Sequence, residues 1–269
     1  MIKRTNTRCV FLSLALIVVV NSHAARANTV GGSNLLSLGS GAAIQPDYEG
    51  GKGTRGGPMP IINARWKRFH VDDGFRVDLF GNAGGEVSIG AAYDFGRRDS
   101  HGEWLAPTGS NYLRGLGTIE GAPTLDAKVT KVIGLSQFGV LQVTGKVTHW
   151  LGSHDFTTAE GGLLFDIPIS ERLTVETSAS AVWANHSYMQ SFFGVSAEQA
   201  LASNFPVFDP HREIKNLTES IQVSYIVRPK LTVVAKLSES QLLGDAQRSP
   251  IVQSRSGVTG SLLLMYRIR

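Results

Sequence analysis

Few residues of this sequence combine the types and the spacing that catalysis or metal binding requires. His149 and His154 are the closest histidine pair after residue 27, but no cysteine and no helical His-x-x-x-His arrangement accompanies them, so we predict no metal site. Ser40 and the pair His186 and Ser187 lack the Gly-x-Ser-x-Gly pattern of an esterase, and they are better explained as unactivated serines. We therefore predict no catalytic residue, no cofactor and no enzyme.

Strict alternation marks the segments that position the polar residues. In residues 86–95 every odd position is apolar, whereas the even positions are polar or small. The same period of two recurs at 141–148, 173–183, 220–228 and 231–238. Because neighbouring side chains of an extended strand point to opposite faces, we predict β-strands here. Several segments run for about ten residues, the length that a tilted strand needs to cross a bilayer.

The polar face of these strands identifies candidates for a lumen. In a membrane barrel the apolar face meets lipid and the polar face lines the interior. The ionisable residues on the polar faces are Glu86, Asp94, Lys146, Glu176 and Lys236. If the barrel is open, these side chains would line a small-solute channel.

The connectors between the predicted strands alternate in length. The short ones are residues 134–137, Ser170-Glu171-Arg172 and Arg228-Pro229-Lys230. The long polar ones lie at about 96–121, 185–216 and 239–257. Short periplasmic turns and long outer loops are typical of outer-membrane barrels, so we place the short connectors in the periplasm. Residues 196–202 are predicted to form one or two helical turns in the longest loop, which either folds into the lumen or stays on the surface.

The strand count depends on the first third of the chain. The segments expected there are residues 35–45, 59–65, 68–72, 74–81 and 86–95. They bring the total to twelve if Trp66-Lys67 is a turn, and an even number is expected of a single-chain bacterial barrel. We predict an all-β fold, a transmembrane antiparallel up-and-down β-barrel of about twelve strands, with ten as the alternative.

Aromatic residues gather mainly near the predicted strand ends. They are Trp66, Trp104, Trp150, Trp183, Phe69, Tyr93, Phe95 and Phe192. Trp and Tyr favour the level of the lipid headgroups, where they form girdles around membrane barrels. We expect these rings to contact the outer-membrane lipid.

The first 27 residues have the three parts of a secretory signal. Lys3, Arg4 and Arg8 precede an apolar stretch at 9–20, and Ala25-Arg26-Ala27 offers small residues at the two positions that signal peptidase recognises. The apolar stretch is shorter than the roughly 20 residues that a membrane-spanning helix needs. We predict cleavage after Ala27, which leaves 28–269 as one barrel domain in the cell outer membrane.

Removal of this segment changes the charge and the cysteine content. Of the 26 basic residues, four lie in residues 1–27, which leaves 22 basic against 22 acidic residues. A formally neutral chain gives no indication of nucleic-acid binding. The single cysteine, Cys9, also lies in the signal segment. The expected mature chain therefore relies on neither disulfides nor thiol-bound metal.

Four strings cannot be explained by strand alternation. They are Gln-Pro-Asp-Tyr-Glu-Gly at 45–50, Leu-Arg-Gly-Leu-Gly at 113–117, Ser-Tyr-Met-Gln-Ser-Phe-Phe-Gly-Val-Ser at 187–196, and Gly-Asp-Ala-Gln-Arg-Ser-Pro-Ile-Val at 244–252. In this order the chain resembles the MipA/OmpV family, the MltA-interacting proteins, over essentially its whole predicted mature length. The string at 187–196 is the most specific of the four.

This resemblance implies an outer-membrane barrel, which in some family members is a scaffold joining a membrane-bound lytic transglycosylase to a penicillin-binding protein during murein growth. The family offers no catalytic residues to transfer. We expect a non-enzymatic scaffold that contacts such partners through the turns Ser170-Glu171-Arg172 and Arg228-Pro229-Lys230. The alternative is a porin-like channel for small solutes.

Overall fold

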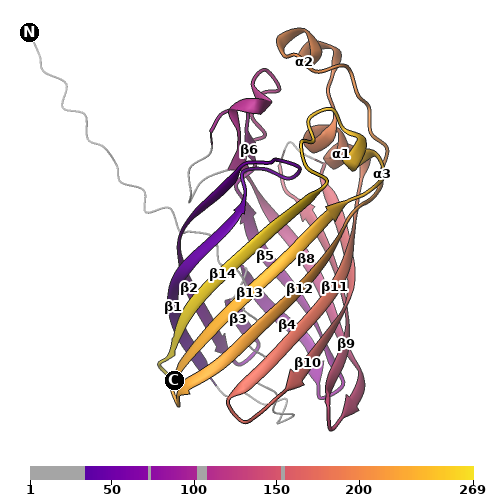
Figure 1. Cartoon of the computed structure of the whole chain (residues 1–269). Coiled ribbons are helices and arrows are strands. Elements are labelled where there is room, and N and C mark those ends of the chain that lie inside the picture. The colour runs from indigo at the N-terminus through magenta and orange to yellow at the C-terminus, as the bar shows by residue number, and fades with distance from the viewer. Residues whose placement is uncertain (1–33, 72–73, 102–107, 153–154) are drawn as a thin grey trace, which may run out of the picture.

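The computed structural model describes residues 34–71, 74–101, 108–152 and 155–269. Twelve strands of this part of the chain close into an antiparallel barrel in the order β1-β14-β13-β12-β11-β10-β9-β8-β5-β4-β3-β2 (Figure 1). Their bounds are β1 (Leu35–Pro46), β2 (Thr54–Trp66), β3 (Phe69–Val71), β4 (Phe75–Asn82), β5 (Gly85–Asp94), β8 (Ala122–Ser136), β9 (Gly139–Trp150), β10 (Thr157–Pro168), β11 (Leu173–Ala184), β12 (Glu213–Arg228), β13 (Leu231–Leu242) and β14 (Ser256–Arg267). The prediction of twelve strands is confirmed, whereas Ala27 lies outside the described residues.

The turn that decides the strand count lies between β2 and β3. Strand β2 ends at Trp66 and β3 begins at Phe69, so Lys67 and Arg68 form the turn, one residue later than predicted. Lys67 has a φ of 55°, the left-handed backbone conformation that a tight turn uses. Strand β3 is short, and its ladder with β2 covers only Ala64 to Trp66.

The period of two separates a lipid face from a lumen face. In β5, Ile89 and Tyr93 are about half exposed, whereas Ser88, directly before Ile89, is fully buried. The outward face is apolar because only lipid tails contact it, and the inward face contacts other side chains.

The lumen of the barrel is filled by two kinds of side chain. An apolar group from β1, β2, β13 and β14 is almost completely buried and consists of Ala43, Met59, Ile61, Val234, Leu263 and Met265. A polar group includes the ion pair between Arg76 and Asp126, 2.5 Å apart, and the hydrogen bond that Gln142 donates to Asp166. Buried polar groups require such partners, because an unsatisfied one costs stability.

The two ends of the barrel differ in the length of their connections. The short turns lie at the end that carries the C-terminus, and the long loops rise from the opposite, outer end (Figure 1). The predicted short connector at 134–137 is shorter than expected, because β8 continues past a bulge between Val132 and Gly134 and ends at Ser136. The turn itself is therefore Gln137-Phe138.

The outer loops contain the remaining elements. These are β6 (Arg97–Arg98), β7 (Thr108–Gly109), the 3₁₀ helix η1 (Asn111–Leu113), α1 (His186–Phe193), α2 (Ala197–Ala202) and α3 (Gly244–Arg248). Helix α2 confirms the predicted helical turns, and it begins with a capping box between Ser196 and Gln199. In the described part of the chain, no helix has the length and apolarity needed to span a membrane.

Candidate functional site

The four strings singled out in the sequence meet in one buried cluster. Tyr48, Leu113, Leu116, Val195 and Ile251 pack together, each no more than 4% exposed. They come from four separate outer loops and represent all four strings. Sequence reasoning treated these strings as independent loops, since nothing in their spacing indicates contact. We call the described residues of 47–53, 95–121, 185–212 and 243–255 the outer cap.

A second cluster attaches the outer cap to the rim of the barrel. From α1, the side chains of Tyr188, Met189 and Phe193 pack against Ala184 at the end of β11 and Phe156 before β10. The rings of Tyr188 and Phe192 stack with their centroids 4.3 Å apart, and Trp150 meets the edge of this stack. The prediction that Trp150 and Phe192 belong to a lipid girdle is wrong, because both rings pack inside the outer cap. Trp104 lies outside the described residues.

Arg97 of β6 binds the carboxyl end of α1. Its Nη1 donates to the carbonyl of Phe192 at 2.6 Å, its Nη2 donates to that of Ser191 at 3.2 Å, and its guanidinium lies 5.7 Å from the Phe192 ring centroid. A cation at this end of a helix satisfies carbonyls that lack a helical donor and complements the helix dipole. Burial lowers the pKa of Arg97 to about 10, so the side chain remains a cation at neutral pH.

Two long-range contacts join the first outer loop to the others. The Nζ of Lys215 lies 2.5 Å from Glu49 and 5.4 Å from the centroid of the Tyr188 ring. The hydroxyl of Tyr48 donates to the carbonyl of Ile251 at 2.8 Å. Burial, followed by the nearby Asp47 carboxylate, raises the pKa of Tyr48 above its ordinary value, so this hydroxyl remains a donor. These contacts hold loops that are far apart in the sequence in one arrangement.

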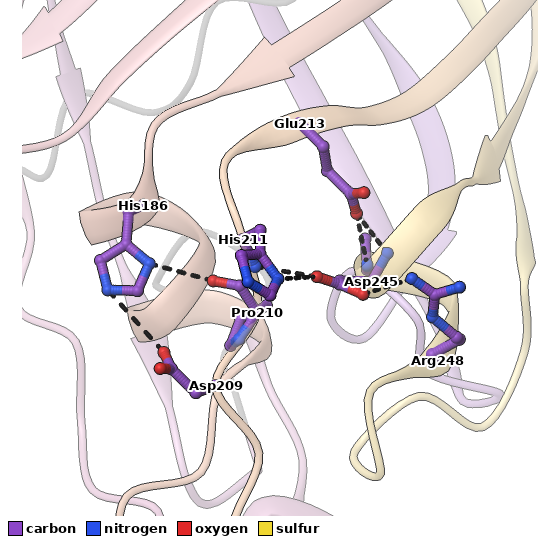
Figure 2. A network of polar contacts seen from close by, with 8 residues as sticks. His186, Asp209, Pro210, His211, Glu213, Asp245 and Arg248 are labelled. Atoms are coloured by element: carbon purple, nitrogen blue, oxygen red, sulfur yellow. Dashed lines mark hydrogen bonds and ion pairs between the residues drawn. The ribbon is translucent and has the colours of Figure 1, made fainter.

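Figure 2 shows the polar contacts that fix α3 to the start of β12 and to the loop before it. Glu213 accepts hydrogen bonds from the backbone N–H groups of Asp245 and Ala246. Asp245 accepts from the backbone N–H of His211 at 2.9 Å and from Arg248 at 2.5 Å. These bonds, the one from the His211 backbone first, hold the pKa of Asp245 well below its usual range.

Figure 2 also shows the ring Nδ1 of His211 2.9 Å from Asp245 and two contacts of His186. The Nδ1 of His186 lies 3.0 Å from the carbonyl of Pro210, and its Nε2 lies 3.8 Å from Asp209. Together with Ser187, this residue lies in α1 and not in a strand. Ser40 lies on the exposed face of β1, and His149 Nδ1 lies 3.0 Å from the hydroxyl of Thr157, while His154 is outside the described residues. The described residues contain no group of three metal-binding side chains.

The structure places the predicted lumen residues inside the barrel. Asp94 and Lys146 line a cavity of about 390 Å³ beneath the outer cap, together with Arg55, Asp126 and Glu160. Its charges partly compensate one another, since Lys146 lies 3.9 Å from Glu160 and Asp126 pairs with Arg76. Elsewhere in the lumen, Glu176 is buried, Glu86 lies 3.6 Å from Arg65, and Lys236 is half-buried.

The predicted contact turns lie at the other end of the barrel. Ser170, Glu171 and Arg172 are exposed between β10 and β11, and the hydroxyl of Ser170 accepts hydrogen bonds from the N–H groups of Arg172 and Leu173. Arg228 is the last residue of β12, and Pro229 and Lys230 form the turn to β13. All of them are exposed.

Solved outer-membrane barrels resemble this chain in fold. An outer-membrane channel from Pseudomonas putida F1 is 9% identical, with 90% of this chain and 98% of that chain covered and a TM-score of 0.42. The NanC porin is 7% identical, with 86% and 98% covered and a TM-score of 0.39. A loop-deletion form of OmpT from Vibrio cholerae is 8% identical, with 87% and 98% covered and a TM-score of 0.39. These likenesses concern the fold alone.

Comparison of the sequence with protein families gives the assignment that these structures do not. A search of the curated proteins found no match. Residues 38–268 match the model of the family described as MltA-interacting protein MipA, which includes all four strings that meet in the outer cap. The matched range also contains every strand of the barrel except the first residues of β1. This outer-membrane barrel therefore belongs to the MltA-interacting protein MipA family.

Proposed function

We propose that this chain is a non-enzymatic scaffold of the cell envelope, which holds a lytic transglycosylase and a penicillin-binding protein at the periplasmic face of the outer membrane. The observation that supports this best is the filled interior. Apolar side chains such as Val234 and Leu263 pack inside the barrel, and a cross-linked outer cap rises from its outer rim. A barrel built in this way uses its strands as a membrane anchor, and its exposed turns remain available to partners.

The contact surface that we propose consists of two neighbouring turns. Ser170-Glu171-Arg172 lies beside the end of β12, where the N–H of Ile226 donates to the carbonyl of Arg172 at 2.8 Å. Arg228-Pro229-Lys230 follows directly at the end of the same strand. Exposed polar turns held by backbone hydrogen bonds offer a preorganised surface, which reduces the entropic cost of binding a partner.

A pull-down from detergent-solubilised envelopes tests the scaffold. An affinity-tagged chain is expected to recover both a lytic transglycosylase and a penicillin-binding protein. The variant E171Q/R172Q/R228Q/K230Q should recover much less of them, whereas a matched variant in the outer cap, K52Q/R212Q, should recover as much as the unaltered chain. Failure of the unaltered chain to recover either class of murein enzyme contradicts the proposal.

The charged cavity beneath the outer cap favours a second function. Side chains of both signs, including Arg55, Asp94 and Lys146, line this space of about 390 Å³, as they would in a pathway for small polar solutes. Planar-bilayer recording separates the two functions. The scaffold predicts no conductance steps from the folded barrel, whereas reproducible steps that change in Lys146→Glu would establish a channel.

A further inference from the structure

The periplasmic end of the barrel carries its exposed cations on one side. Going around the barrel from β11 to β3, the turns and strand ends present Arg172, Arg228, Lys230, Arg267, Arg269, Lys67 and Arg68, all exposed. We call these seven residues the basic arc. Glu171 is the acidic side chain among them, and the described residues form no ion pair with any of the seven. The arc thus concentrates positive charge in a chain whose predicted mature form is neutral.

Backbone contacts make the basic arc continuous. The carbonyl of Arg172 accepts from β12, the Nη2 of Arg267 donates to the carbonyl of Pro229 at 2.7 Å, and the carbonyl of Arg269 accepts from Leu36 of β1. The opposite half of the same rim carries less charge, since its turns consist of uncharged residues such as Ala83 and Gln137-Phe138, although the exposed Lys131 of β8 lies opposite Gly85 at the start of β5. The positive charge is therefore concentrated on one side of the rim and is not a general property of the turns.

Aromatic rings place the basic arc relative to the membrane. Trp66, Tyr225 and Tyr266 point outward near the ends of β2, β12 and β14, each about half exposed. Such rings settle at the level of the lipid headgroups. The Nζ of Lys67 lies 5.1 Å from the centroid of the Trp66 ring, so this ammonium is at the same level. The cations of the arc thus lie beside the phosphates of the periplasmic leaflet.

We propose that the basic arc binds the phosphate headgroups of anionic phospholipids in the periplasmic leaflet. Lysine and arginine donors match phosphate oxygens, and cations beside an anionic membrane surface attract its lipids with an energy that salt screens. This inference does not depend on the scaffold function. Arg172, Arg228 and Lys230 belong to both proposed surfaces, so its test alters only arc residues outside the contact turns. A lipid on the arc would also fix the rotation and depth of the barrel, because the opposite half of the rim has no comparable cluster of cations.

Quenching of Trp66 by brominated lipids tests the proposal. The full chain is reconstituted in mixed vesicles of phosphatidylcholine and phosphatidylglycerol in which one of the two lipids carries bromine on its acyl chains, and the Trp66 signal is isolated by subtraction of a Trp66→Phe sample. We expect quenching to indicate about a fivefold preference for phosphatidylglycerol at low salt, since one cation near an anionic surface has an effect of this size. The preference should fall toward one in high salt.

Two variants, each with three fewer cations, distinguish an effect of the basic arc from an effect of the net charge of the chain. K67N/R68Q/R269Q should abolish the preference around Trp66, and asparagine at position 67 tolerates the left-handed backbone of the turn. K52Q/R212Q/R255Q, in the outer cap, should leave the preference unchanged. Heat-dependent mobility in gels verifies that each variant has folded. Equal quenching by the two lipids in the unaltered chain, or a preference that persists in the arc variant, overturns the proposal.

A sedimentation assay with purified murein identifies the competing ligand. If the arc variant loses murein binding and the unaltered chain shows no lipid preference, the basic arc binds the cell wall polymer and the lipid proposal is wrong. If the arc variant sediments with murein to the same extent as the unaltered chain but has lost the lipid preference, the result supports anionic lipid as the ligand of the basic arc. Neither variant alters the turns Ser170-Glu171-Arg172 or Arg228-Pro229-Lys230, so failure of the scaffold pull-down is distinguishable from failure of this proposal.

Discussion

The outer cap and the basic arc hold their charged residues in opposite ways. Arg97 of the cap and Lys215, which binds the cap from the start of β12, are buried, and each meets specific acceptors, the carbonyls of α1 and the carboxylate of Glu49. In the arc, Lys67, Lys230 and Arg269 are exposed and form no ion pair with the described residues. Buried charges of the first kind fix loops in place, because burial without a partner is costly. Exposed charges of the second kind contribute little to stability and remain available for a ligand.

The largest effect is expected from removing an aromatic anchor of the cap. Phe193→Ala should destabilise the folded cap by about 3–5 kcal/mol, because removal of the buried ring at the end of α1 leaves a cavity among Phe156, Met189 and Ala246. Hydrogen exchange should show faster exchange across 186–193 and 244–252, while the strands stay protected. Unchanged protection of these loops would mean that the cap does not depend on this cluster.

A smaller but substantial effect is expected from the buried cation. Arg97→Met should destabilise the cap by about 1–3 kcal/mol, because the carbonyls of Ser191 and Phe192 lose their donors in a buried site. Proteolysis of the loop 185–212 should become faster in the folded protein. Arg98→Met, at the partly exposed neighbour in β6, serves as the control and should leave the rate of proteolysis within error. Equal effects of the two substitutions would contradict the role assigned to Arg97.

The contacts of α3 should depend on pH. The folded cap lowers the pKa of Asp245, so the ionised carboxylate stabilises the docked helix fully above the ordinary carboxyl pKa of about 4. This contribution should decline as the pH falls from there toward the lowered pKa. Protection factors of residues 244–248, corrected for intrinsic exchange, should decrease below pH 4 in the unaltered chain. In Asp245→Asn the protection factors of these residues should be lower at neutral pH and should change little on acidification. A decrease below pH 4 as large as that of the unaltered chain would refute the assignment.

The smallest effect is expected in the basic arc. Lys230→Gln should change the stability of the barrel by no more than about 0.5 kcal/mol, because the side chain is exposed and has no ion-pair partner among the described residues. Unfolding in urea measures this difference, with Lys215→Gln, which removes the buried partner of Glu49 in the outer cap, as the comparison. A loss for Lys230→Gln as large as for Lys215→Gln would remove the contrast between cap and arc.

Sequence patterns predicted the barrel better than the cap. Alternation in segments such as 86–95 and 231–238 depends only on which face meets lipid, so strands, orientation and the strand count could be inferred locally. Strand ends were less certain, since β12 begins at Glu213, inside the predicted loop 185–216. The helix α1 was missed because its residues pack through tertiary contacts, and its moderate length gives no strong periodic signal.

The sequence by itself therefore determined a twelve-stranded outer-membrane barrel and its family, because strand alternation and the family strings are local properties of the chain. Tertiary structure alone decided that Tyr48, Leu113, Val195 and Ile251 meet in one core, and that the seven cations of the basic arc lie side by side. The reason is physical. Closure of the barrel brings the first and last strands together, and which loops and turns become neighbours follows from that closure and not from distance along the chain.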